Sequence, residues 1–166
     1  IGCGPGRLTQ LISKIENINL TAVDTDSEFI KYAKSLLPNT CIVNQSVLTY
    51  RHSAPVDAFI SQGMHHHIGK GEDTKTYLRN IAKNLRPGGI YIISDEFIPD
   101  YNNEAEREIN LVIWYSHIIA SALKMGYSGL AKEEAKTLLD DIYEGREDIS
   151  LSKTQEQIEL VLLVVE

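Results

Sequence analysis

The sequence has few cysteines and no excess of basic residues. Each of these features excludes a class of protein. Its two cysteines, Cys3 and Cys41, lack the CxxC spacing of a zinc site, so neither a disulfide scaffold nor a structural metal site is expected. Asp and Glu outnumber Lys and Arg by 23 to 16, which gives a net charge of −7. Binding to nucleic-acid phosphates requires clustered basic residues, so a nucleic-acid partner is not expected.

The sequence also lacks a hydrophobic run long enough to span a membrane. The longest run, residues 111–123, is interrupted by Ser116, His117 and Ser121 and falls short of the roughly 20 residues that a span requires. The two free thiols suit a reducing compartment, so we expect a cytoplasmic protein that does not bind membranes. Its 166 residues, 43% of them hydrophobic, are enough for one globular domain with a real core.

Helical and strand patterns alternate along the first 95 residues. Leu8, Leu11, Ile12 and Ile15 repeat at helical spacing. A Thr-Asp-Ser-Glu capping box at residues 25–28 begins a second helix, with Phe29, Ile30, Ala33 and Leu36 on one face. A third helix is predicted around residues 78–85, and strands are predicted at residues 20–24, 41–43, 57–60 and 90–93. Strands separated by helices indicate an α/β fold with a doubly wound, mainly parallel sheet.

Beyond Asp95 the pattern becomes helical. Asn103 is expected to cap a long helix that ends near Gly126, and a second helix is expected over residues 132–143. A third helix is predicted to begin at Ser152, although residues 158–165 could instead form a strand. We therefore divide the chain into a core at residues 1–98 and a helical cap region of the same domain at residues 99–166.

The long helix at residues 104–125 contains Trp114, Tyr115 and His117. These side chains could cover a substrate pocket, but an apolar helix more often packs into a core. A homodimer face is the alternative use of this helix.

Four motifs lie in register along the core. Gly2-Cys3-Gly4-Pro5-Gly6 precedes the first helix, where glycines let a ligand lie against the backbone near helix N-terminal amides. Asp24 ends the strand that follows. The third predicted strand, with Val56 included at residues 56–60, leads into Gly63-Met64-His65-His66-His67. Finally, Leu85-Arg86-Pro87-Gly88-Gly89 precedes the last strand of the core.

With these motifs, residues 1–95 resemble the class I S-adenosylmethionine-dependent methyltransferases, in the methyltransferase-domain group. The resemblance implies a Rossmann-like fold and S-adenosylmethionine as the cosubstrate. Asp24 is similar to the acid that holds the ribose, and a carboxylate can accept hydrogen bonds from two vicinal hydroxyls. The cosubstrate-binding residues that the resemblance implies are Gly2, Cys3, Gly4, Gly6, Asp24, Thr25, Ser46, Val47 and Gln62.

Two departures from the family pattern affect these expectations. The family often has an acid after its third strand that contacts adenine, and Ser46 stands at that place here. The family also has an acid just before the first glycine, and only Ile1 remains of the strand that leads there. We therefore expect an N-terminal strand truncated in this sequence, a natural protein that extends upstream through an apolar strand ending in Glu or Asp, and further strands beyond Glu166.

The candidate catalytic residues are His66 and His67, which follow the fourth strand of the family at its carboxyl end, where doubly wound sheets bind ligands. Methyl transfer needs a general base only if the acceptor must lose a proton. The alternative interpretation is two solvated histidines and one packed histidine. Three consecutive histidines do not converge on a metal ion, so no metal site is expected. Asp95 and Glu96 could also line the pocket, or could be ordinary polar residues at a strand end.

The resulting prediction is methyl transfer from S-adenosylmethionine to a small-molecule acceptor. The acidic composition favours a small molecule because no basic stripe is present. A non-catalytic relic that binds the cosubstrate, or a partner subunit, is one alternative. An NAD-dependent oxidoreductase is another, but its GxGxxG motif requires glycine where Arg7 stands.

Overall fold

The computed structural model describes residues 1–68, 72–95, 97–144 and 149–150. The chain divides into two compact units, one containing Ile1–Asp95 and the other containing residues 97–150. All of the predicted cosubstrate residues belong to the first unit. Among the described residues, no helix combines the length and the apolar character needed to cross a lipid bilayer.

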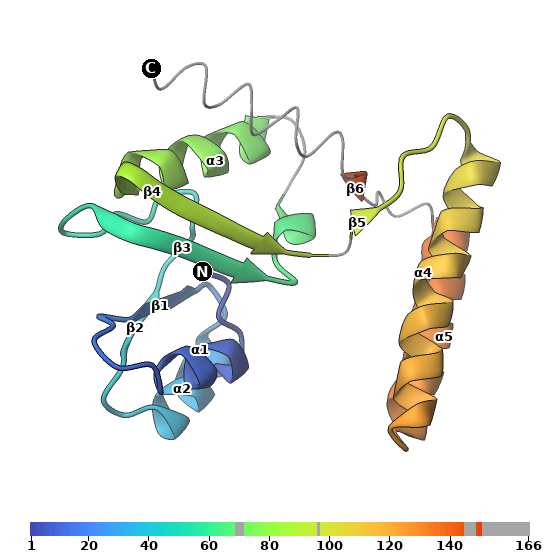
Figure 1. Cartoon of the computed structure of the whole chain (residues 1–166), viewed down its shortest axis with the longest axis horizontal. Coiled ribbons are helices and arrows are strands. Elements are labelled where there is room, and N and C mark those ends of the chain that lie inside the picture. Colours follow the sequence, from blue (N-terminus) through green and yellow to red (C-terminus); the bar gives the residue numbers. More distant parts are fainter. Residues whose placement is uncertain (69–71, 96, 145–148, 151–166) are drawn as a thin grey trace. The chain divides into compact units, whose positions relative to one another are not determined.

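Parallel strands pair two by two in the described part of the first unit (Figure 1). Strand β1 (Thr21–Asp24) pairs with β2 (Cys41–Asn44), and β3 (Val56–Gln62) pairs with β4 (Leu85–Ser94). The amino group of Ile1 donates a hydrogen bond to the carbonyl of Ile60 (2.8 Å), and the Cys3 N–H donates to the carbonyl of Val23 (3.1 Å). The start of the chain thus lies between the two pairs. The predicted parallel pairing is confirmed, but as two separate pairs rather than one unbroken sheet.

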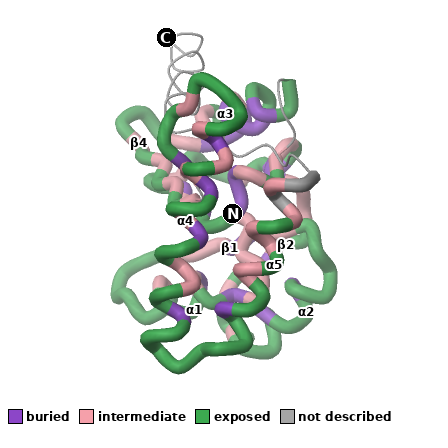
Figure 2. The backbone as a smooth tube through the Cα atoms, turned by 90° about the vertical axis from the view of Figure 1, so that its right-hand side faces the viewer, coloured by how far each residue is buried: buried purple, intermediate pink, exposed green. Residues whose placement is uncertain are grey.

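Helices cover both faces of these strands. The helices of the first unit are α1 (Arg7–Ile12), α2 (Ser27–Leu36) and α3 (Glu72–Asn84). Successive residues of a strand point to opposite faces. Ala22 of β1 packs with Ile30 and Ala33 of α2, whereas Val23 belongs to a cluster with Tyr77 of α3. The successive residues Ala22 and Val23 are therefore both buried, because helices cover both faces of β1 (burial is coloured in Figure 2), and the doubly wound arrangement is confirmed.

The first two helices differ from the sequence-based predictions in detail. Helix α1 ends at Ile12, and Leu11 is 62% exposed, so the apolar pattern extending to Ile15 was wrong as a helix. Asp26, not Thr25, caps α2, because its carboxylate accepts hydrogen bonds from the N–H groups of residues 28 and 29. Phe29 lies on the exposed side of α2. An apolar residue in a short surface helix need not be buried, since apolar atoms form much of any protein surface.

The turn predicted at residues 86–89 lies inside β4 rather than before it. Val56 pairs with Leu85, but Ala58 pairs with Ile90, so β4 has three more residues than β3 between these two pairs. The Arg86 side chain bonds Asp57 across the irregularity. An insertion of this kind bends a strand without ending its pairing.

The second unit is mainly helical. It contains β5 (Phe97–Ile98), α4 (Glu104–Lys124), α5 (Ser128–Glu144) and β6 (Ile149–Ser150). Asn103 caps α4 by accepting a hydrogen bond from the Glu106 N–H (3.0 Å), and Met125 ends the helix, as predicted. Helix α5 begins four residues earlier than predicted, and the short parallel pair β5–β6 was not predicted.

Part of the apolar side of α4 packs into the core of the second unit. Ile98, Leu111 and Tyr115 are buried, with Trp114 packed against them, so the core interpretation is confirmed for these side chains. Ile109 and Ile113 are exposed, and a homodimer face on α4 stays a prediction. The helix predicted from Ser152 and the alternative strand at residues 158–165 lie outside the described residues.

Candidate functional site

A cavity of about 640 Å³ lies in the first unit, beside the residues that follow β1, β2 and β3. Ligands bind at this edge of doubly wound sheets because the loops after the strands gather there. The residues that line it are Gly2, Gly4, Val23, Asp24, Thr25, Asp26, Phe29, Gln45, Ser46, Val47, Leu48, Gly63, Met64, His67, Ile68 and Asp73.

Asp24 connects the glycine-rich loop to the start of α2. Its Oδ2 accepts a hydrogen bond from the Gly4 N–H (2.7 Å), and its Oδ1 accepts one from the Asp26 N–H (2.9 Å). Each carboxylate oxygen has two lone-pair sites. The side chain can therefore hold the loop and still accept hydrogen bonds from a ligand in the cavity.

Two glycines of the loop line this cavity and have different surroundings. Gly2 has φ +60°, and a Cβ there would lie 2.2 Å from Cγ of Met64. Gly4 has φ +49°, and a Cβ there would meet nothing within 4 Å. Both residues line the cavity. Gly2 is thus required by close packing, whereas Gly4 leaves open space in which a ligand can approach the main chain.

The turn after β2 forms another wall of the cavity. The Ser46 hydroxyl accepts a hydrogen bond from the Leu48 N–H (3.2 Å). Buried Asn80 of α3 donates hydrogen bonds to the carbonyls of Val47 (2.6 Å) and Tyr50 (2.8 Å). These bonds fix a partly apolar surface, which suits a flat aromatic base.

The histidine run forms a short 3₁₀ turn, His65–His67, in which each side chain has a different environment. His65 is buried beside Tyr77, with ring centroids 5.5 Å apart. Burial lowers the pKa of His65, the charge of Asp95 opposes that shift, and His66 adds to it. His67 is exposed and lines the cavity.

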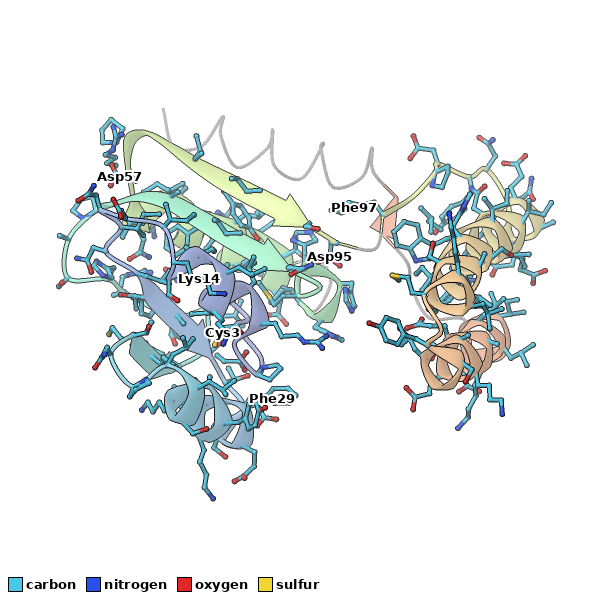
Figure 3. All side chains as sticks on the ribbon, turned by 60° about the horizontal axis from the view of Figure 1, so that its bottom comes forward. Cys3, Lys14, Phe29, Asp57, Asp95 and Phe97 are labelled. Carbon is cyan, nitrogen blue, oxygen red and sulfur yellow. The ribbon has the colours of Figure 1, made fainter. Side chains whose placement is uncertain are left out.

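His66 is held by Asp95 at the end of β4. Its Nδ1 lies 2.5 Å from Oδ1 of Asp95, and its ring centroid lies 3.9 Å from that of His67. The other oxygen of Asp95 accepts hydrogen bonds from the N–H groups of Met64 (3.0 Å) and His65 (2.5 Å). Figure 3 shows Asp95 and Asp57 at opposite ends of the β3–β4 pair. Glu96 lies outside the described residues.

A hydroxyl network lies below this turn. Ser61 and Tyr91 share a hydrogen bond of 2.7 Å, and the Tyr91 hydroxyl also contacts that of Tyr77. Burial raises the pKa of Tyr91, so the phenol keeps its proton at neutral pH. The network is uncharged, and its member Tyr77 packs against the ring of His65.

The structure brings most of the predicted site residues together. Gly2, Gly4, Asp24, Thr25, Ser46, Val47 and His67 line the cavity, whereas Cys3, Gly6, Gln62 and His66 do not. Cys3 packs beside the buried cluster of β1 and α2, where burial raises its thiol pKa. A Cβ on Gly6 would lie 3.2 Å from that of Ala33. Gln62 is exposed at the end of β3. Contact of any of these residues with a cosubstrate stays a prediction.

Sequence reasoning did not name several lining residues. Phe29 lies on α2, Ile68 follows the 3₁₀ turn and Asp73 lies on α3, and only folding brings them to one place. Met64 and Gln45 could have been found, because each stands beside a residue already singled out. Within the described ranges, no group of three or more His, Cys, Asp or Glu side chains could hold a metal ion.

The comparisons with known proteins identify the class. The model of the family described as "Methyltransferase domain" matches residues 1–93. The chain therefore belongs to the methyltransferase-domain family, and the predicted class I, S-adenosylmethionine-dependent methyltransferase class is confirmed.

One curated relative and two solved structures illustrate the likeness. The trans-aconitate 2-methyltransferase of Azoarcus sp. (strain BH72) is 28% identical over 94 residues, 56% of this chain and 36% of the relative. The plantazolicin methyltransferase BpumL, solved with a triazolic desmethylPZN analog and SAH, has a TM-score of 0.60 at 18% identity, with 96% of this chain and 52% of that chain covered. A methyltransferase from Clostridium acetobutylicum ATCC 824 has a TM-score of 0.51 at 23% identity, covering 55% and 39%.

The comparisons establish the fold and cover only part of each relative. The two structures confirm the Rossmann-like fold. The chain spans about a third of the length of the curated relatives that it matches, 36% in each case.

Proposed function

We propose that this protein transfers a methyl group from S-adenosylmethionine to a small-molecule acceptor, with the cosubstrate bound in the cavity beside β1, β2 and β3. One observation carries the proposal: a single cavity combines the glycine-rich loop, Asp24, the Ser46–Val47 turn and His67. Family membership supports the same activity.

The chemistry of the lining fits this cosubstrate. The Asp24 carboxylate has lone pairs left for ribose hydroxyls. Gly4 leaves space for the ligand to approach the backbone. Val47, Leu48 and Phe29 supply apolar surface for the adenine. The carboxylates of Asp26 and Asp73 in the lining suit a ligand with a positively charged sulfur.

The chain's own contribution is to position and desolvate the reactants. The bound cosubstrate supplies an activated methyl group that an acceptor displaces in line, so orientation accounts for much of the rate. We assign to the acceptor side His67, which lines the cavity, and His66, whose ring lies against that of His67. Either imidazole could receive a proton from an acceptor hydroxyl or amine near neutral pH.

The acceptor is proposed to be a small molecule, and the named relative supplies the first compound to test. Trans-aconitate appears in the names of both curated relatives. A panel of small acids, amines and hydroxyl compounds that includes trans-aconitate covers both kinds of acceptor: carboxylates, which are already ionised near neutral pH, and hydroxyls and amines, which lose a proton that a histidine base can take.

Isothermal titration and a turnover assay test the proposal. We expect saturable one-to-one binding of S-adenosylmethionine and S-adenosylhomocysteine, and no binding of NAD. Release of S-adenosylhomocysteine that depends on one of the acceptors would then show an enzyme. Binding of NAD alone would favour an oxidoreductase, and cosubstrate binding without turnover across the panel would favour a non-catalytic relic.

A further inference from the structure

We propose that Asp95 is the positioning residue that fixes His66 as the general base of this methyl transfer. The inference rests on the proposed function and assigns separate roles to the three histidines. It also gives a role to a buried carboxylate at the end of β4.

The surroundings of Asp95 determine which nitrogen of His66 carries the proton. The Asp95 side chain is 1% exposed, and its Oδ2 accepts hydrogen bonds from the N–H groups of Met64 and His65. Its Oδ1 faces Nδ1 of His66 at 2.5 Å. An ionised carboxylate can only accept hydrogen bonds, so Nδ1 of a neutral His66 must be the donor. The lone pair of the imidazole is then on Nε2.

The position of His66 is suited to proton transfer. Its side chain is 25% exposed, unlike that of the buried His65. Its ring lies against that of His67, which lines the cavity. His66 therefore combines partial exposure, contact with the ring of a residue that lines the cavity, and a hydrogen bond to a buried carboxylate.

The proton and electron balance of the step is simple. The lone pair of an acceptor oxygen or nitrogen forms the new bond to the methyl carbon, and the carbon–sulfur bond breaks with both electrons going to sulfur. The acceptor's proton moves to Nε2 of His66. The resulting imidazolium is stabilised by the negative charge of Asp95 through Nδ1–H.

The variant Asp95→Asn tests this arrangement because the backbone dictates how the amide must lie. Two N–H donors, from Met64 and His65, require an oxygen at the Oδ2 position. The amide NH₂ is then placed toward His66, where it donates to Nδ1 and moves the imidazole proton to Nε2. The variant should therefore reverse the tautomer of His66 and remove its ability to act as a base.

Imidazole ¹H–¹⁵N NMR of the full-length, histidine-labelled protein shows directly which nitrogen of His66 carries the proton. The His66 signals are assigned by their loss in His66→Gln. We expect Nδ1–H in the wild type and Nε2–H in Asp95→Asn, and no change in Asp57→Asn. Asp57 is a matched control because it carries an exposed ion pair with Arg86 at the other end of β3. A wild-type His66 with its proton on Nε2 would overturn the proposal, as would a variant that keeps the wild-type tautomer.

Kinetics with a hydroxyl or amine acceptor found by the panel give the second readout, because only an acceptor that must lose a proton needs a base. We expect Asp95→Asn to lower kcat by roughly 100-fold or more, the usual range for general-base catalysis. The Kd for S-adenosylmethionine should stay within about twofold. The variant Asp95→Asn should have no further effect in a His66→Gln background, because Asp95 acts through His66. Additive losses would overturn the proposal. If the wild type fails to bind S-adenosylmethionine, the proposed function is overturned. If it binds the cosubstrate and turns over but the tautomer or the kinetics of the variants differ from those expected, only the role of Asp95 is overturned.

Discussion

Two glycines of the same loop provide a contrast between stability and binding. Gly2 and Gly4 both have positive φ, so alanine at either site costs about 1–2 kcal/mol in backbone strain. At Gly2 the new methyl would also overlap Met64, with 2.2 Å to its Cγ and 2.7 Å to its Cβ. Such overpacking costs a further ~1–3 kcal/mol. Gly2→Ala should therefore lose about 2–5 kcal/mol of unfolding free energy, and Gly4→Ala only about 1–2 kcal/mol.

Binding should follow the opposite order where the protein stays folded. A methyl group on Gly4 meets no protein atom within 4 Å, so it extends into space that we assign to the cosubstrate. Loss of ~1.4–2.8 kcal/mol of binding corresponds to roughly ten- to hundredfold weaker affinity. Urea denaturation gives the stabilities, and titration with S-adenosylmethionine gives the affinities. The reasoning is refuted if Gly4→Ala binds like the wild type, or if both variants lose equal stability.

Three further predictions concern other residues of the first unit. Asp24→Ala should weaken S-adenosylmethionine binding at least about tenfold by titration, because a hydrogen bond to a charged group contributes roughly 1.5–3 kcal/mol; unchanged affinity would remove Asp24 from the site. Asn80→Ala should lower the unfolding free energy by about 1–3 kcal/mol in urea, because it removes the amide donor from the Val47 carbonyl, whereas the Tyr50 carbonyl still accepts from Asn84 (3.2 Å); a loss within error would show that water replaces the amide. His65 has its pKa lowered by burial from 6.5, so the unfolded chain binds more protons as pH falls below about 6.5. The wild type should lose stability relative to His65→Leu by up to about 1.4 kcal/mol per pH unit over that range, and parallel stability curves would contradict the burial argument.

The sequence predicted elements best where local chemistry decides them. The Asn103 cap and the end of α4 near Gly126 were predicted correctly because a capping side chain and a helix-ending glycine act within a few residues. The end of α1 and the exposed side of α2 were predicted wrongly. Apolar periodicity shows that a helix has an apolar face, but it does not show whether another element is present to cover Leu11 or Phe29.

The candidate site divides in the same way. Motif spacing along the sequence was enough to identify the glycine-rich loop, Asp24 and the histidine run without a structure. The sequence could not show which of three consecutive histidines is buried, which lines the cavity and which is held by a carboxylate. Asp95 stands 29 residues from His66, and such a pairing depends on the register of β3 with β4.

The sequence by itself therefore determined the class of the protein, the alternation of strands and helices, and the residues available for a cosubstrate site. These properties come from local preferences and from motif spacing, which act along the chain. Only the tertiary structure decided that Asp24 holds Gly4, that Gly2 is pressed against Met64, and that Asp95 faces His66 rather than solvent. Each of these contacts joins segments at least 20 residues apart, and only strand pairing and core packing bring such segments within bonding distance.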